Sequence, residues 1–373
     1  MIAAFKKAYD TFRGVAPPER TVPVMDGPLR PNTLLDQAPA VLELAGVDNL
    51  LDTPNGLLCS VGADLMSLDG PGGGLSARPV QSFANPITCL ASDGADGLAI
   101  GLDGSGLVLR GGPHDGRAIE RAGGTRLLSP TSALFLDPDT LIVSNGSSEG
   151  PVSDWKRDLM AQRHKGSVWR LDLRQPDAAV KLADGLAFPN GLAGGGGTIL
   201  VSEAWRNRIV RLAATQASVP VEVLGDLPAY PSRIIPSVEG GFWLALFAPR
   251  NQLIEFVITE RRYCGRMMER VHPDYWIAPA LSSGASFLEP IQGGARKKLN
   301  TLKPWSPSWS YGLVVRCDAR FKPVGSFHSR ADGHVHGITA LCERQGRLLV
   351  AARGSGRIVS IDPLADPDLG DLA

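Results

Sequence analysis

A pattern that recurs six times constrains the fold of this chain more than any other feature. Each copy has a turn with Gly or Asp, a short apolar strand, a polar or Gly break, and a second alternating strand. The copies are NGLLCSVGADLMSL at 55–68, DGLAIGLDGSGLVLR at 96–110, DTLIVSNGSS at 139–148 resumed as HKGSVWRLDL at 164–173, GTILVSEAWRNRIVRL at 197–212, GGFWLALFAPRNQLIEFV at 240–257 and GRLLVAARGSGRIVSI at 346–361. The period of two and the Gly breaks predict β-hairpins or meander segments.

A single hairpin buries too little apolar surface to be stable alone, and placing such units around a ring solves this problem. Six units over residues 40–365 average about 55 residues each, which suits blades of four strands. The 43 glycines and 29 prolines also fit many short strands separated by turns. The sequence therefore predicts an all-β fold, a six-bladed β-propeller over residues 41–373.

Three segments fall outside the repeat. Residues 1–40 are predicted to form a short N-terminal helix and an arm, because MIAAFKKAYDTFRGV places Ile2 and Phe5 on one helical face. Insertions at about 146–165 and 258–310 interrupt or separate the units. Long insertions in a compact domain are typically lids or binding loops, and these contain aromatic residues. We therefore expect them to cover one face of the ring.

Charge and cysteine content argue against several classes of protein. Lys+Arg and Asp+Glu number 38 each, whereas a nucleic-acid binder normally carries a basic excess, so no nucleic-acid partner is expected. The five cysteines are scattered without a C-x-x-C pair, so neither a zinc site nor a disulfide framework is indicated. No stretch approaches the ~20 apolar residues of a membrane span, and the N-terminus lacks the apolar core of a signal peptide. These features predict a cytoplasmic protein with no membrane partner.

Several segments match, in order, the signatures of a known superfamily. FPNGLAGGGGTILVSEAWRNRIVRL at 188–212 has its F-x-N-G turn before a strand that ends in an A-E-T-like triplet. DLPAYPSRIIPSVEGGFWLAL at 226–246 is similar to its G-Y-P-D-N-I segment, and residues 310–362 resemble its final blade. From about residue 45 the chain thus resembles the strictosidine synthase-like and gluconolactonase (senescence marker protein, regucalcin-like) β-propeller superfamily. The resemblance implies an active site in the mouth of the central channel, and it is less specific for the reaction.

The resemblance also implies a divalent cation, usually calcium, that polarises a lactone or ester carbonyl in the channel. Asp48 stands where a ligand glutamate is usual, and Asn190 matches the family asparagine, so these two are the expected metal ligands. Thr131 and Ser232 replace the usual Asn and Asp. Arg233 adds positive charge beside this set, which opposes calcium binding. No cofactor is therefore certain, and a metal-free site stays an open alternative.

Histidine and arginine supply the candidate catalytic groups. His334 and His336 in DGHVHGIT lie on one face, because side chains alternate along an extended chain. Histidine suits general-base chemistry near neutral pH, so His336 is predicted to be catalytic and His334 to contact the substrate. Arg233 is predicted to bind a substrate carboxylate or an oxyanion, and Asp48 is the third catalytic candidate. Alternatives are surface histidines and a plain ion pair of Arg233.

Four further polar residues are predicted to contact the substrate. Thr131, Asn190 and Ser232 begin strands at corresponding points of different units, and such positions in a propeller face the channel. Asn145 lies in IVSNGSS at the end of a predicted strand. The alternative role for all four is turn formation, since Asn, Ser and Thr make local hydrogen bonds to the backbone.

Together these features predict a hydrolase that acts on a lactone or ester of a small molecule in the central channel. A second hypothesis is a metal-independent lyase, isomerase or condensing enzyme with His336 as base and Arg233 holding an anionic substrate. Condensation of an amine with an aldehyde is not supported, because Thr339 stands near the family's last-blade glutamate. A third hypothesis is a non-catalytic binding propeller, which an exposed aromatic surface at 258–310 would indicate.

Overall fold

The computed structural model describes residues 21–70, 74–175, 178–195, 197–283, 297–298, 301–302 and 309–364. The N-terminal helix predicted in the first fifteen residues lies outside these ranges. In the arm that follows, η2 (Gly27–Leu29) and α2 (Leu34–Gln37) pack against the outer strand β25 (Pro323–Ser329). No helix in the described ranges is both long and apolar enough to span a membrane.

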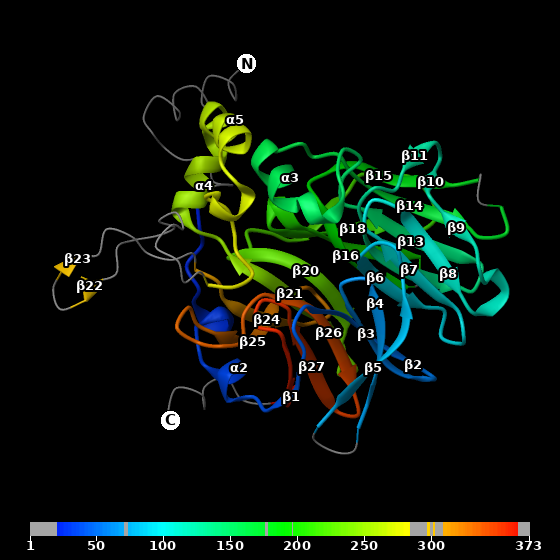
Figure 1. The fold of residues 1–373 in the computed structure, drawn as a ribbon, viewed down its shortest axis with the longest axis horizontal. Helices are drawn as coiled ribbons and strands as arrows, with labels where there is room; N and C mark the ends of the chain where they lie inside the picture. The colour runs from blue at the N-terminus through cyan, green and yellow to red at the C-terminus, as the bar shows by residue number, and fades with distance from the viewer. Residues whose placement is uncertain are drawn as a thin grey trace.

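Six four-stranded antiparallel sheets form the blades of a propeller (Figure 1). The innermost strands are β2 (Val47–Thr53), β6 (Ile87–Ser92), β12 (Pro130–Asp137), β16 (Pro189–Gly195), β20 (Ala229–Pro236) and β26 (Ile338–Arg344). Each of these strands contacts the next one, and β26 contacts β2, so the inner strands form a closed ring. The prediction of a six-bladed β-propeller is confirmed.

The remaining strands complete each blade outward from the axis. The second strands are β3 (Gly56–Val61), β7 (Leu98–Leu102), β13 (Thr140–Asn145), β17 (Thr198–Glu203), β21 (Phe242–Pro249) and β27 (Arg347–Ala352). The third strands are β4 (Asp64–Asp69), β8 (Gly106–Arg110), β14 (Gly166–Asp172), β18 (Arg208–Ala213), β24 (Gly312–Cys317) and β28 (Arg357–Ile361). The outer strands are β5 (Ser76–Ser82), β9 (Ala118–Ile119), β15 (Val180–Leu186), β19 (Val221–Leu224), β25 and β1 (Ala40–Glu43). Short hairpins β10–β11 (Arg121–Ala122, Thr125–Arg126) and β22–β23 (Lys297–Lys298, Thr301–Leu302) lie outside the blades.

The sixth blade joins the two ends of the described chain. Its first three strands, β26 to β28, come from the C-terminal part of the sequence, whereas its outer strand β1 comes from the N-terminal part. β1 pairs antiparallel with β28, with Ala40 opposite Val359 and Glu43 opposite Arg357. This pairing closes the ring by backbone hydrogen bonds, because strands from the two ends of the described chain share one sheet.

The alternating strands bury both faces of each blade. In β13, Leu141 and Val143 pack toward the second blade with Leu107, while Ile142 faces the fourth blade with Ile199. All three β13 residues are fully buried. The continuous apolar run LIV therefore does not contradict a strand, because a blade inside the ring has a neighbour on each side.

The fifth repeat copy, residues 240–257, was predicted to be a β-hairpin, but only its first half is a strand. Its first half forms β21, but its second half forms helix α4 (Gln252–Thr259). The side chain of Asn251 caps this helix by accepting a 2.8 Å hydrogen bond from the backbone N–H of Leu253. Buried Ile254, Val257 and Ile258 recur at helical rather than strand spacing. The third strand of the fifth blade is instead β24, so residues 312–329 complete that blade rather than the last one.

Two insertions form a helical cap on the ring. The third blade contributes η4 (Val152–Asp154) and α3 (Trp155–Ala161) between β13 and β14. The fifth blade contributes α4, α5 (Arg261–Arg270) and η6 (Pro273–Tyr275) between β21 and β24. Helices α3, α4 and α5 contact one another and lie together at one side of the molecule (Figure 1). Two further short helices, η3 (Gly112–His114) and η5 (Ala204–Arg206), lie in loops between strands.

The cap has an apolar core of its own. Trp276 and Met267 from the cap are buried with Phe247 and Tyr230 from the fifth blade. Burying an aromatic or methionine side chain contributes about 1.5–3 kcal/mol each. The cap is thus packed onto the ring rather than loosely attached, and the wall that it adds to the site is fixed.

Candidate functional site

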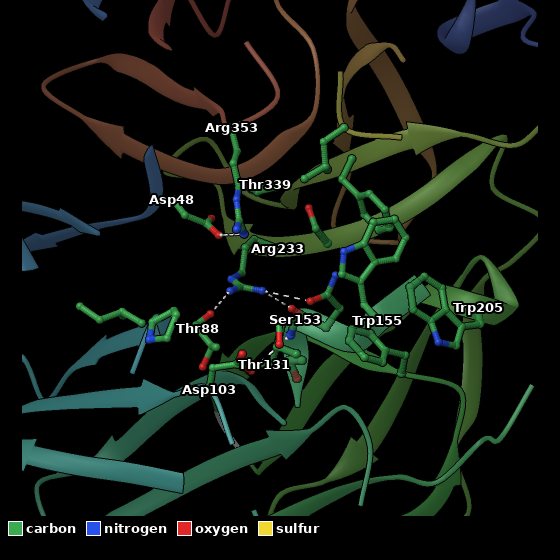
Figure 2. A pocket seen from close by; sticks show the side chains of 18 residues that line it. Asp48, Thr88, Asp103, Thr131, Ser153, Trp155, Trp205, Arg233, Thr339 and Arg353 are labelled. Carbon is green, nitrogen blue, oxygen red and sulfur yellow. Dashed lines mark hydrogen bonds and ion pairs between the residues drawn. The ribbon is translucent and has the colours of Figure 1, made fainter. Parts of the chain in front are cut away.

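A cavity of about 280 Å³ lies at the centre of the ring beside the cap (Figure 2). Every inner strand contributes one or two residues to its lining: Asp48 from β2, Ile87 and Thr88 from β6, Thr131 from β12, Asn190 from β16, Ser232 and Arg233 from β20, and Thr339 from β26. Because all six blades meet here, the cavity lies on the channel axis. Its volume is near the lower end of the range for small-molecule sites, about 300–1,000 Å³.

The pairing register between the inner strand and the second strand shifts near the start of every inner strand. In the second, third, fourth and sixth blades, the shift skips one residue, which is Thr88, Thr131, Asn190 or Thr339. In the fifth blade it skips two residues, Ser232 and Arg233. A residue left out of the ladder by such a bulge is turned away from its normal position in the pleat. In these five blades the residues that leave the ladder are thus the polar ones that line the cavity. In the first blade the shift skips Asn49 and Leu50, and the cavity is lined instead by Asp48, which stays paired with Ser60.

Gly191 shows how tightly the blades approach at the axis. A methyl group built on this residue would collide with the carbonyl oxygen of Ser232 and would lie 3.0 Å from the Cα of Arg233. The Asn-Gly pair at 190–191 thus has two roles. Asn190 supplies the polar lining, and Gly191 allows β20 to come close enough to place Arg233 beside it.

The Arg233 guanidinium is bound by oxygen atoms from three other blades. Its NH1 donates to the backbone oxygen of Asn190 at 2.6 Å and to Asn190 Oδ1 at 3.2 Å. Its NH2 donates to Asn49 Oδ1 at 2.9 Å and to the Thr88 backbone oxygen at 2.7 Å. A guanidinium has two hydrogens on each terminal nitrogen, so all four are engaged. Arg233 therefore acts on a bound molecule through its charge rather than by donating these hydrogens.

Arg353 supplies a second positive charge to the cavity. Its NH1 lies 3.0 Å from Asp48 Oδ2, and the other carboxylate oxygen accepts a 2.9 Å hydrogen bond from the backbone N–H of Asn49. Among the described residues, the Arg353 side chain makes no other hydrogen bond, and it is 48% exposed. Asp48 thus fixes one edge of the guanidinium, and the opposite edge is available to a ligand.

Asp103 is a carboxylate of the cavity that the sequence interpretation missed. It follows β7, lines the cavity, and accepts a 3.3 Å hydrogen bond at Oδ1 from the backbone N–H of Ser153. In the described part of the chain, no protein group donates to its second oxygen. Figure 2 shows Arg233 between the Asp48–Arg353 pair and Asp103. Asp103 is therefore positioned to accept a proton from water or a ligand.

Aromatic side chains form the opposite wall. Phe188 stacks on Trp205 with ring centroids 4.6 Å apart, and Trp155 of the cap stacks on Trp205 at 6.0 Å. Phe247 meets Trp155 edge to face at 5.6 Å. The indole N–H of Trp205 donates a 2.8 Å hydrogen bond to the buried Asp158, which ties the wall to α3. The cavity thus pairs an apolar face with a charged one.

Five of the residues predicted from sequence meet in this cavity. Asp48, Thr131, Asn190, Ser232 and Arg233 all line it. The hydroxyls of Thr131 and Ser232 are buried and already hydrogen-bonded to backbone oxygens, of Pro189 in the first case and of Ala245 and Ile338 in the second. These two hydroxyls therefore hold neighbouring strands together.

The histidines and Asn145 lie elsewhere. His336 is 6% exposed, its Nδ1 is 2.7 Å from the Ser310 hydroxyl, and its Nε2 is 2.7 Å from the Arg330 backbone oxygen. Burial lowers the pKa of His336 below its ordinary value. His334 is exposed, with Nδ1 3.2 Å from Asp36. None of these groups lines the cavity.

Asn145 is fully buried in the third blade. Its Oδ1 accepts a 2.8 Å hydrogen bond from the backbone N–H of Ser129, and its Nδ2 donates to the Arg126 backbone oxygen at 3.3 Å. Both ends of the amide are therefore used to fix the loop before β12. This geometry matches the turn-forming alternative for Asn145.

The oxygen atoms at the channel centre do not suit a calcium ion. Calcium takes six to eight oxygen ligands with carboxylates among them. The oxygens of Asn190, Asn49 and Thr88 accept hydrogen bonds from Arg233, and the Asp48 carboxylate is paired with Arg353. Within the described residues, no group of three or more His, Cys, Asp or Glu side chains could hold a metal ion. No step of the chemistry is therefore assigned to a metal.

Comparison with known proteins supports the fold. No family model matches the chain, and no curated protein sequence matches it either. Among solved structures, a gluconolactonase from Xanthomonas campestris is similar with a TM-score of 0.52 and 15% identity, covering 86% of this chain and 87% of that protein. A luciferin-regenerating enzyme has a TM-score of 0.49 and 10% identity, over 90% of this chain and 95% of the other. The protein thus has the propeller fold that the gluconolactonase also has.

Proposed function

We propose that this protein is a hydrolase that cleaves a lactone or ester of an anionic small molecule in the channel cavity. The observation that carries the proposal is the arrangement of charges around one cavity. Within the part of the chain that the structure describes, no protein group donates to the second Asp103 carboxylate oxygen and Arg353 keeps an open guanidinium edge, while Arg233 is a fixed positive charge. The propeller fold, shared with a gluconolactonase, is consistent with such a reaction.

The two walls define the substrate class. The stacked rings of Trp155, Trp205 and Phe188 favour a ring or an alkyl chain on one side of the substrate. The open edge of Arg353 favours a carboxylate, since a guanidinium binds carboxylates in a bidentate manner. A small lactone or ester that carries both an apolar part and a carboxylate fits this description best.

The reaction then follows from the remaining charges. The Asp103 carboxylate takes a proton from a water molecule, and the water oxygen forms a bond to the carbonyl carbon of the substrate. The carbonyl electron pair moves onto its oxygen, and the charge of Arg233 stabilises this oxyanion. When the carbonyl re-forms, the bond to the alkoxide oxygen breaks, and the alkoxide receives the proton from Asp103. The products are a carboxylic acid and an alcohol, joined in one molecule if the substrate is a lactone.

A hydrolysis screen tests the proposal. Purified protein is incubated with paired lactones and esters that differ only in the presence of a carboxylate, and acid release is followed in a weakly buffered indicator assay. We expect turnover, with carboxylated substrates preferred, and loss of turnover in Asp103→Asn. The absence of hydrolysis across the panel would reject the proposal in favour of a lyase, an isomerase or a binding propeller, whereas full activity of Asp103→Asn would reject Asp103 as the base.

A further inference from the structure

The environment of the Arg233 guanidinium is that of a bound cation. Two side-chain amide oxygens, from Asn190 and Asn49, and two backbone oxygens, from Asn190 and Thr88, lie 2.6–3.2 Å from its terminal nitrogens. These are neutral oxygen atoms of the type that hard cations also prefer. The four acceptors satisfy the four N–H bonds of the two terminal nitrogens, and Arg233 is half-buried in the cavity wall.

The local backbone is built to deliver this side chain. The register shift between Pro231 and Ile234 leaves two residues out of the β20–β21 ladder, as the shift between Asp48 and Leu51 does in the first blade, whereas the other four inner strands skip one residue at this point. With both residues outside the ladder, Arg233 reaches oxygens of three other blades, while the Ser232 hydroxyl is bonded to neighbouring backbone oxygens. Gly191 provides the space for this approach. The register shift in the fifth blade and Gly191 in the fourth blade therefore both contribute to the position of Arg233.

The bonds of Arg233 also connect distant parts of the ring. The side chain starts in the fifth blade and reaches the fourth blade at Asn190, the first blade at Asn49, and the second blade at Thr88. A metal ion at the axis would join blades in the same way, by drawing oxygens from several strands to one charge. Here a covalently attached group makes those connections.

We infer that the Arg233 guanidinium takes the place of a divalent cation at the centre of the channel. It supplies a permanent positive charge to the cavity and ties four blades together, so that folding stability and charge at the site do not depend on a metal. This inference goes beyond the proposed function, because it assigns the cation position of the fold to a side chain and holds whatever the substrate is.

The test compares calcium responses of the wild-type protein and Arg233→Asp. Each protein is treated with chelator, and its Tm is then measured in chelator and in millimolar calcium, with metal content determined by elemental analysis. We expect the wild-type Tm to change by less than about 1 °C and its calcium content to be well below one per chain. In Arg233→Asp, the new carboxylate joins the released oxygens, so calcium should raise Tm by about 5 °C or more.

Arg353→Asp is the matched control. It makes the same change of charge in the same cavity but leaves the oxygens around Arg233 occupied, so it should gain no calcium response. Stoichiometric calcium in the wild-type protein, or a wild-type Tm that rises with calcium, would overturn the inference. A folded Arg233→Asp that ignores calcium would overturn it as well. If Arg233→Asp does not fold, the wild-type Tm response to calcium and the wild-type calcium content decide the test. None of these measurements requires hydrolysis, so the inference and the proposed function fail separately.

Discussion

Asp48 in the first blade and Arg353 in the sixth form an ion pair across the seam of the ring, with Arg353 NH1 3.0 Å from Asp48 Oδ2. Asp48 is 8% exposed, whereas the Arg353 side chain is 48% exposed. The buried acid therefore orients the arginine, and the exposed part of the arginine is where we propose that the substrate carboxylate binds. In the proposed reaction Asp48 is accordingly a positioning residue that acts through Arg353.

The first prediction concerns this pair. Asp48→Asn keeps the shape of the side chain but removes the charge that holds Arg353, so KM for a carboxylated lactone or ester should rise about tenfold, equivalent to about 1.4 kcal/mol, while kcat changes little. Steady-state kinetics on the matched substrate without a carboxylate provide the control. An equal rise in KM for both substrates would show that Asp48 does not act through recognition of the anion.

The second prediction concerns the base. Asp103→Asn removes the proton acceptor and retains the hydrogen bond from Ser153, so kcat should fall by about 10²–10⁴-fold with no more than a small change in Tm. Stopped or continuous acid-release assays measure the rate, and thermal unfolding measures Tm. Unchanged kcat in a folded variant would remove Asp103 from the reaction.

The third prediction separates His336 from the chemistry. Its two ring nitrogens contact Ser310 and the Arg330 backbone oxygen, and the ring does not line the cavity. His336→Ala should therefore lower the free energy of unfolding, by about 1–3 kcal/mol for the unpaired partners, and leave kcat of the folded protein within about twofold. Loss of turnover at an unchanged Tm would instead support His336 as the base, as the sequence alone predicts.

The fourth prediction is a pH dependence of stability. His328 is fully buried, with Nδ1 3.1 Å from the Tyr311 hydroxyl and Nε2 2.7 Å from the Ser326 hydroxyl, and burial lowers its pKa to about 4. An unfolded histidine binds a proton below pH ~6.5. Between these two values the unfolded state holds more protons, so stability is full above pH ~6.5 and is lost as pH falls toward 4, by about 3 kcal/mol in total from this group.

Urea unfolding at pH 7 and at pH 5 measures this loss. The matched variant is His328→Gln, which retains polar atoms but does not titrate, and the difference between the two pH values should be smaller in that variant. If the wild-type protein and His328→Gln lose the same stability over this range, the acid sensitivity arises from other groups.

The ring of six blades could be predicted because each repeat carries its own strand and turn pattern. Asp48, Thr131, Asn190, Ser232 and Arg233 could be placed at the channel for the same reason, since equivalent positions in a ring of blades reach the same end of the axis. The structure of the second half of the fifth copy could not be predicted, because the segment LIEFV fits both a strand and a helix. The packing of the cap decides between the two.

Asp103 and Arg353 were missed, although antiparallel pairing offers a signal for them. The last residue of a second strand lies opposite the first residue of its inner strand, as Leu102 does opposite Ile87 and Ala352 opposite Ile338. A charged residue that directly follows a second strand is therefore a candidate for the channel mouth, although Arg250, which follows β21, is buried against Asp226 and Glu255 instead. His336 precedes its inner strand, but it packs under the loop at Ser310 and Arg330, which no periodicity of the sequence reveals.

Hydrolysis of a carboxylated lactone or ester by the wild-type protein in excess chelator, measured beside Asp103→Asn, tests the central claim most directly. We predict that the wild-type turnover rate stays within about twofold in chelator and with added calcium. We also predict that the turnover rate of Asp103→Asn is lower by about 10²-fold or more. Hydrolysis that stops in chelator and returns with calcium would contradict the assignment of the channel charge to Arg233. Hydrolysis that persists in Asp103→Asn would contradict the assignment of the base.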